Sequence, residues 1–303
     1  MRGRSRHRLI WAVGAGLALL GATVDAQAAE QRPAGAALPG AVVTDAVTPF
    51  DSEPAKTAQA RCPAGTRVTG GGARISAGGG RVALVRAQPV HEEGAQDRFV
   101  VTAVEDEIGT TATWSLQAYA ICANVPGLTI VRAAVTDAGR SYQSVISRCP
   151  AGQRTVTGGG GQVSGGGGQV SLAGFGNTVT GTQMGTLAAG LEDLSGFSGS
   201  WTLISYTVCG PENIGGLGGT QTLPIDSNSP KIVSVACDTG ASVTGTGAQV
   251  SDVSVDGPQL YLEAVVPEVL VGGVPGNNVQ VIARESIATG EVWNVRRHSH
   301  CSR

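Results

Sequence analysis

A nine-residue segment that begins with tryptophan and ends with cysteine occurs three times in this chain. It reads WSLQAYAIC at residues 114–122, WTLISYTVC at 201–209 and, less well matched, WNVRRHSHC at 293–301. Every tryptophan after the first thirty residues lies in this segment. A repeat with a long period indicates one supersecondary unit per copy, so we expect three similar units.

Each segment has an upstream counterpart that begins with another cysteine. The pattern V-T-G-x-G-[AG]-[RQ]-[IV]-S follows each of these cysteines and starts at residues 68, 156 and 243. The first cysteines of successive repeats are 87 and 88 residues apart, at positions 62, 149 and 237. Glycine at such places permits a positive φ angle or a close approach between backbones. The shared structural residues are Trp114, Trp201, Trp293, Tyr119, Tyr206, Gly70, Gly72, Gly158, Gly160, Gly245 and Gly247.

Residues 1–28 are predicted to be a secretory signal peptide. Four arginines precede an apolar stretch at 9–24, and an A-x-A cleavage site follows at 26–28. A retained membrane anchor is the alternative, but the apolar stretch is short and ends in a processing site. We therefore expect an extracellular, secreted protein with no membrane insertion after cleavage.

The six cysteines are expected to form disulfides, because an even number in a secreted chain is typical of that arrangement. Metal binding or free thiols are the alternatives, but no C-x-x-C spacing occurs. Six cysteines allow 15 connectivities in principle, and the repeat favours the symmetric one. The predicted bridges are Cys62–Cys122, Cys149–Cys209 and Cys237–Cys301.

The charge of the mature chain limits its partners. Without residues 1–28 the chain has 17 basic and 22 acidic residues, a net charge of about −5. This balance argues against a nucleic-acid partner and against electrostatic binding to anionic lipid. The glycine runs at 158–161 and 165–168 are not followed by G-K-[ST], so no nucleotide or other cofactor is expected.

The strand signals predict an all-β protein. Alternating runs at 81–85, 169–172 and 259–262 are typical of strands, and no capped amphipathic helix of ten residues follows the signal peptide. We expect a flexible tail at 29–41 and β repeats at 42–122, 128–209 and 222–301. The predicted fold is a three-fold pseudosymmetric β-prism-like assembly, in which three Greek-key sheets bury their inner faces together. Three tandem small β-sandwich modules are the alternative.

The C-P-x-G…V-x-G-G-G…W-x-L-x-x-Y-x-x-C pattern resembles that of uncharacterised secreted proteins of actinobacteria. In repeat number and glycine punctuation it also resembles the β-prism proteins, such as vitelline membrane outer layer protein and the jacalin-type lectins. That second resemblance concerns architecture and implies the fold, with only a faint indication of sugar binding. The G-x-x-x-D loop of the jacalin-type sugar site does not occur at a matching place.

Three groups of residues could carry chemistry, and each has a structural alternative. Glu105, Glu192 and Glu285 stand nine, nine and eight residues before a tryptophan, and these carboxylates could form a calcium site or a glycosidase pair. The structural alternative is a solvated strand end or an ion pair, with Arg74 or Arg284 as partner. We favour the structural alternative, because calcium loops need more oxygen ligands.

The histidines and tryptophans are interpreted in the same way. His298 and His300 would share a strand face, but they have no evident third metal ligand, and His298 holds the position of Tyr119 and Tyr206. The tryptophans are either sugar-stacking platforms or core residues, and a fixed place beside a cysteine favours the core.

We therefore predict a secreted, non-enzymatic surface or binding protein with no catalytic, metal or cofactor residues. Its expected partner is a polysaccharide or a cell-envelope component. The alternative is a secreted, glycosidase-like hydrolase whose carboxylates come from different repeats.

Overall fold

The computed structural model describes residues 38–138, 141–155, 159–180, 183–211, 216–252, 260–287 and 290–302. The predicted signal peptide and the tail up to residue 37 lie outside the described residues, as does Gly158. The described residues belong to one compact unit built from β-strands and a single short 3₁₀ helix, η1 (Val271–Gly273). None of the helical segments within these residues is long and apolar enough to cross a membrane.

The strands form three antiparallel sheets, which we number I to III. Sheet I has the order β1 (Val42–Val47), β6 (Ser115–Ala123), β3 (Arg67–Ser76), β17 (Leu260–Val269), β18 (Pro275–Glu285) and β15 (Lys231–Ala236). Sheet II has the order β2 (Ala55–Arg61), β5 (Arg98–Glu105), β4 (Val82–Val90), β10 (Gly160–Ser164), β13 (Ser200–Pro211) and β7 (Thr129–Ala138), with β9 (Gln153–Thr155) paired to β13. Sheet III has the order β14 (Gly216–Thr222), β19 (Trp293–Ser302), β16 (Ser242–Asp252), β11 (Val170–Thr180), β12 (Gln183–Glu192) and β8 (Tyr142–Arg148).

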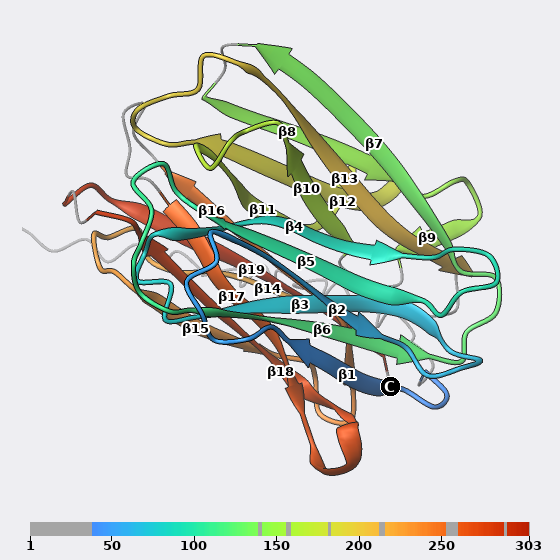
Figure 1. Ribbon diagram of the computed structural model, residues 1–303. Coiled ribbons are helices and arrows are strands. Elements are labelled where there is room, and N and C mark those ends of the chain that lie inside the picture. The colour runs from blue at the N-terminus through green and yellow to red at the C-terminus, as the bar shows by residue number, and fades with distance from the viewer. Residues whose placement is uncertain are drawn as a thin grey trace, which may run out of the picture. The chain divides into compact units, whose positions relative to one another are not determined.

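The sheets do not correspond one to one with the repeats. Sheet I combines three strands of repeat 1 with three of repeat 3, and Figure 1 shows the blue and green strands continuing into orange ones. Sheet II combines repeats 1 and 2, and sheet III combines repeats 2 and 3. Each repeat therefore contributes to two sheets, and the three repeats form a closed ring. This arrangement differs from three separate modules on a string.

A glycine of the repeated motif lies at each junction between repeats. The neighbouring strands pair over two residues there, as in Ala73 with Val265 on β3 and β17. A Cβ atom on Gly72, Gly160 or Gly247 would collide with a backbone carbonyl of the neighbouring repeat in the same sheet. The corresponding carbonyls belong to Val265, Ala87 and Phe175. Glycine is required because only a residue without a side chain lets the two backbones come this close.

The first glycine of the motif follows a β-bulge. The register between β3 and β6 shifts between Val68 and Gly70, and that between β16 and β19 shifts between Val243 and Gly245. The bulged Thr69 is buried, and its hydroxyl donates a hydrogen bond of 3.0 Å to the carbonyl oxygen of Ile121. This side-chain bond compensates for part of the ladder that the bulge interrupts.

One hydrophobic cluster contains buried residues of all three repeats. Trp114, Trp201 and Trp293 are its largest members, and each is at most 1% exposed. The disulfides lie toward the other end of the strands and join Cys62 to Cys122, Cys149 to Cys209 and Cys237 to Cys301, the pairs that the repeat predicts. Disulfides of this kind indicate an oxidising, non-cytoplasmic compartment.

Two local features differ from the sequence expectations. The segment between the expected repeats 2 and 3, which end at residue 209 and begin at residue 222, contains most of strand β14, which extends sheet III beside β19. Leu38, expected in the flexible tail, is buried against Ala123, Val125 and Leu128. Glycine-rich and alanine-rich segments have weak strand signals, so their pairing partners decide their conformation.

We predict that Gly72→Ala destabilises the protein by at least about 1–3 kcal/mol, because the added methyl group has no space beside the backbone of Val265. Urea denaturation would measure the change. Gly219→Ala is the matched control, since its nearest neighbour would be Val235 at 3.3 Å and its φ angle is not positive. Equal stability of the two variants would contradict the role of the junction.

Candidate functional site

Two of the three carboxylates singled out in the sequence, Glu105 and Glu192, serve buried tryptophans. Glu105, Glu192 and Glu285 each end the strand that precedes a tryptophan, on β5, β12 and β18. The indole Nε1 of Trp114 donates to Glu105 at 3.1 Å, and that of Trp201 donates to Glu192 at 2.8 Å. These two glutamates are therefore neither solvated strand ends nor members of an ion pair, the two structural roles that the sequence suggested. Each is the hydrogen-bond acceptor that a buried indole requires.

The second oxygen of each glutamate is also engaged. Glu105 accepts a hydrogen bond from the backbone of Thr110 at 3.1 Å, and Glu192 accepts one from Phe197 at 3.2 Å. Arg284, suggested above as an ion-pair partner, bonds to Glu263 instead. The glutamates therefore hold the loops that lead into β6 and β13. This use of both oxygens argues against a glycosidase pair formed by Glu105 and Glu192.

The only two lysines of the chain form a second structural feature around these tryptophans. Lys56 lies 4.8 Å from the ring centroid of Trp114, and Lys231 lies 4.7 Å from that of Trp293. Both side chains are 4% exposed, and they form ion pairs with Asp51 and Asp226. A cation over an aromatic face is stabilising, more so when it is partly desolvated.

Sequence reasoning missed this arrangement, although the chain carries its signal. In repeats 1 and 3 a lysine stands six residues before the first cysteine, and an aspartate stands eleven before it. All three repeat tryptophans are at most 1% exposed, so they are core residues. They cannot act as exposed platforms for sugar rings.

We predict that Glu105→Ala lowers the free energy of unfolding by about 1–3 kcal/mol, because the buried indole N–H loses its acceptor. Glu105→Gln should cost less, since an amide oxygen can still accept the bond. Denaturation followed by tryptophan fluorescence would measure both values, with the exposed Glu53→Ala as control. A larger loss for the glutamine variant than for the alanine variant would contradict this assignment.

His298 and His300 lie at the junction between repeats 3 and 2. His298 on β19 pairs with Gly247, as Tyr119 pairs with Gly72 and Tyr206 with Gly160, so it occupies the tyrosine position. His300 is fully buried, and its Nδ1 lies 2.7 Å from the side-chain nitrogen of Asn177 on β11. The two rings therefore pack across the glycines of β16 onto the neighbouring repeat.

Burial makes both histidines weak bases. It lowers the pKa of His298 to about 4, and the charge of Arg296 acts in the same direction. It lowers the pKa of His300 to about 3, and His298 adds to the effect. Both rings are therefore neutral in the folded protein at neutral pH, whereas they titrate near 6.5 in an unfolded chain.

We predict that this junction makes the protein acid-sensitive. Below pH 6.5 the unfolded chain binds more protons than the folded one, so stability falls as the pH drops toward 4. The expected slope is about 1.4 kcal/mol per pH unit for each histidine. The double variant with His298→Tyr and His300→Val, the residues of repeat 2, should show a shallower decline in urea denaturation. An unchanged slope would contradict the prediction.

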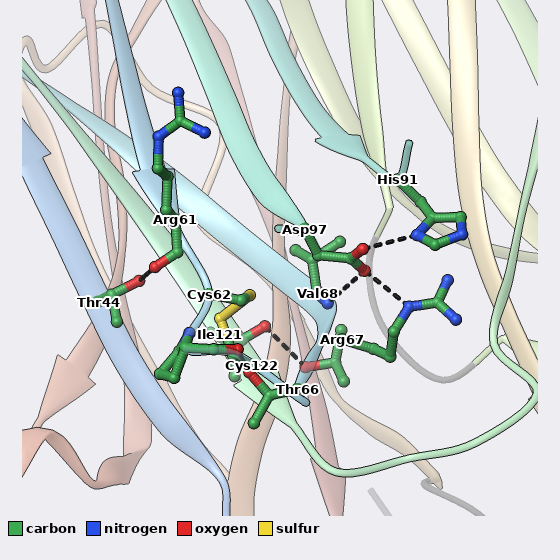
Figure 2. The surroundings of a disulfide bond; sticks show 12 residues. Thr44, Arg61, Cys62, Thr66, Arg67, Val68, His91, Asp97, Ile121 and Cys122 are labelled. Atoms are coloured by element: carbon green, nitrogen blue, oxygen red, sulfur yellow. Dashed lines mark hydrogen bonds and ion pairs between the residues drawn. A yellow bond between two sulfur atoms is a disulfide. The ribbon is translucent and has the colours of Figure 1, made fainter. Parts of the chain in front are cut away.

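Figure 2 shows a polar cluster beside the Cys62–Cys122 disulfide. Asp97 is buried, and its carboxylate accepts hydrogen bonds from Arg67 Nε at 2.9 Å and from the backbone of Val68 at 3.0 Å. His91 Nδ1 lies 2.6 Å from the other oxygen of Asp97. The equivalent positions in repeats 2 and 3 are Met184 and Asn277, whose carbonyls likewise accept from a cysteine N–H.

This His–Asp pair orients an imidazole as a general base would be oriented, but catalysis also needs a nucleophile within reach. The nearby hydroxyl of Thr66 donates to the carbonyl oxygen of Pro63 at 2.8 Å, which closes a turn. The structural role is clearer, because the cluster ties the β4–β5 hairpin to the first residues of β3.

Acidic residues of repeats 1 and 2 meet at a different junction. The amide nitrogen of Gln169 donates to Glu107 at 3.0 Å and to the Ser195 hydroxyl at 2.9 Å. That hydroxyl in turn donates to Asp193 at 2.6 Å. Burial raises the pKa of the Asp193 carboxyl, and the negative charge of Glu107 acts in the same direction. Two carboxylates from different repeats therefore lie close enough to influence each other.

The outer face of sheet II carries several polar side chains. Threonine hydroxyls form pairs across its strands, Thr57 with Thr102 at 3.0 Å and Thr136 with Thr202 at 2.7 Å. The Tyr206 hydroxyl donates to Gln162 at 3.0 Å. Hydroxyl and amide groups on a pleated face can bind the hydroxyl groups of a sugar, and this face is the candidate binding surface.

Within the described ranges, no group of three or more His, Cys, Asp or Glu side chains could hold a metal ion. Comparison with known proteins does not identify a family, since no protein-family model and no curated protein matches the chain.

Proposed function

We propose that this protein is a secreted, non-enzymatic binding protein that attaches to a glycan or another component of the cell envelope. The observation that supports this proposal is that the reactive side chains have packing roles in the core. Glu105 and Glu192 are bonded to buried indoles, and the lysines are stacked on tryptophans. The threonine and glutamine side chains of sheet II, in contrast, line an outer face.

We further propose that the body is β-prism-like, with three repeats related by a pseudo-three-fold axis. The support comes from equivalent junctions between β3 and β17, β4 and β10, and β11 and β16. Because the paired strands of these junctions run antiparallel, the tryptophan ends of all three repeats face the same way. The disulfide ends then lie together at the opposite end.

The partner and the compartment follow the same reasoning. Signal peptide and disulfides together favour an extracellular protein, and the net negative charge of the mature chain disfavours nucleic acid and electrostatic binding to anionic lipid. A rigid sheet face held by disulfides suits binding, because little conformational entropy is lost when a ligand docks on it.

We predict saturable retention of the mature protein on an insoluble cell-envelope preparation, with no release of reducing ends. Co-sedimentation would measure binding, and a reducing-sugar assay would measure hydrolysis in the same tubes. Protein reduced and alkylated under denaturing conditions serves as the control, because it lacks the folded surface. Failure to bind any envelope fraction would contradict the proposed function.

A secreted hydrolase is the second candidate, and the acidic junction favours it. A carboxylic acid with a raised pKa beside a second carboxylate is the arrangement that glycoside hydrolysis uses. If reducing ends are released, Asp193→Asn and Glu107→Gln should each abolish the release, while the exposed Glu93→Gln should not. Hydrolysis that survives both substitutions would exclude this junction as the active site.

A further inference from the structure

Four arginines lie on the outer face of sheet II. Arg61 on β2 is directly opposite Arg98 on β5, and Arg86 on β4 is opposite Thr102 on the same strand. Arg132 on β7 is opposite Tyr206 on β13. Alternate residues of β2 and β7 are exposed in phase with Arg61 and Arg132, which places these side chains on the outer face.

The registers bring the four positions into one band across the sheet. Arg86 pairs with Gln162 on β10, and Gln162 pairs with Ile204, two residues from Tyr206. The band therefore runs over all six strands and stays within four residues along the strand direction. With a strand spacing of about 4.8 Å and a rise of about 3.3 Å per residue, it measures roughly 24 by 13 Å.

The three-fold repeat provides an internal reference for this band. At the positions of Arg61, Arg86, Arg98 and Arg132, sheet I has Ala236, Ala264, Asn278 and Asp45. Sheet III has Arg148, Gly174, Gly185 and Thr220. At these four positions sheet I has no arginine, and sheet III has one. Packing therefore does not require the four arginines of sheet II.

The electrostatics of the band are unfavourable without a partner. Arg61 and Arg98 lie directly opposite each other on neighbouring strands. Like charges in such a pair are destabilising. Glu92 in the β4–β5 hairpin pairs with Arg98 at 2.6 Å and also interacts with the charge of Arg61, which offsets part of this repulsion. The outward positions of the six strands themselves carry no carboxylate in the part of the chain that the structure describes. Arg86 donates to the neutral Gln88 at 2.6 Å.

We propose that the outer face of sheet II binds an acidic polysaccharide, whose carboxylates pair with Arg61, Arg86, Arg98 and Arg132. This inference rests on the proposed function and specifies its ligand class. A planar guanidinium bonds a carboxylate in a bidentate manner. The threonine and glutamine side chains between the arginines are suited to sugar hydroxyls.

A polysaccharide fits this face better than a nucleic acid does. The mature chain carries a net charge of about −5, so a dense polyanion is repelled by the rest of the surface. A sugar acid places its charges farther apart, with hydroxyl groups between them, and this matches arginines separated by neutral polar residues. Double-stranded DNA is therefore included in the test as a competitor.

The test uses polygalacturonate as the probe and fully methyl-esterified polygalacturonate as its uncharged counterpart. We expect the wild-type protein to bind the first in isothermal titration and to ignore the second. The quadruple variant with Arg61, Arg86, Arg98 and Arg132 changed to glutamine should bind about tenfold more weakly or worse, since each charge-assisted contact is lost. Added salt should weaken wild-type binding more than variant binding.

Arg74→Gln with Arg148→Gln, on sheets I and III, is the matched control and should change affinity by no more than about twofold. The single variant Arg132→Gln, at an exposed position, keeps the test valid if the quadruple variant does not fold.

Equal binding of the esterified polymer, equal loss in the control, or equal competition by DNA of the same charge would each overturn the proposal. Retention on the envelope without binding to polygalacturonate would overturn it and leave the proposed function standing. Binding to polygalacturonate without retention on the envelope would do the reverse.

Discussion

Neighbouring repeats are joined by short stretches of backbone pairing, and every such stretch depends on a glycine. At Gly72, Gly160 and Gly247 the carbonyl of the neighbouring repeat occupies the space that a side chain would fill. If these strands stood farther apart, the half-sheets of the three repeats could not continue into one another. The shared hydrophobic cluster and the two-sheet structure of each repeat both follow from this close approach.

The buried polar groups show how a small repeat stabilises large aromatic side chains. A tryptophan at the end of each unit fills the space between two sheets, and its indole nitrogen needs an acceptor inside the core. Glu105 and Glu192 provide that acceptor in repeats 1 and 2, while lysines cover the rings in repeats 1 and 3. Residue types that often mark active sites therefore have packing roles here.

The near-symmetry of the chain separates structural from functional residues without any related sequence. Positions that are alike in three repeats, such as the tryptophans and the motif glycines, are explained by the fold. Surface positions that differ among the repeats are not explained by the fold, and the four arginines of sheet II form such a set. In the interior, the neutral histidines at one junction differ from the residues of the other two repeats, and we expect them to lower the stability of the protein in acid.

Several strands were predicted from sequence, and others were missed for a physical reason. The alternating runs at 81–85, 169–172 and 259–262 overlap the first residues of β4, β11 and β17. Strands β2 and β14 were missed because alanine, glycine and polar residues carry little strand signal. The acceptor role of Glu105 was missed as well, although its fixed spacing from Trp114 was noted.

The sequence by itself determined the number of repeats, the cysteine pairs and the β class, because each of these leaves a local or periodic mark on the chain. Only the tertiary structure decided that each sheet is shared by two repeats. Backbone hydrogen bonds are the same for every residue type, so side-chain patterns do not specify which strand pairs with which. For the same reason Arg61, Arg86, Arg98 and Arg132, which are scattered along the chain, were recognised as one surface only after the registers of sheet II were known.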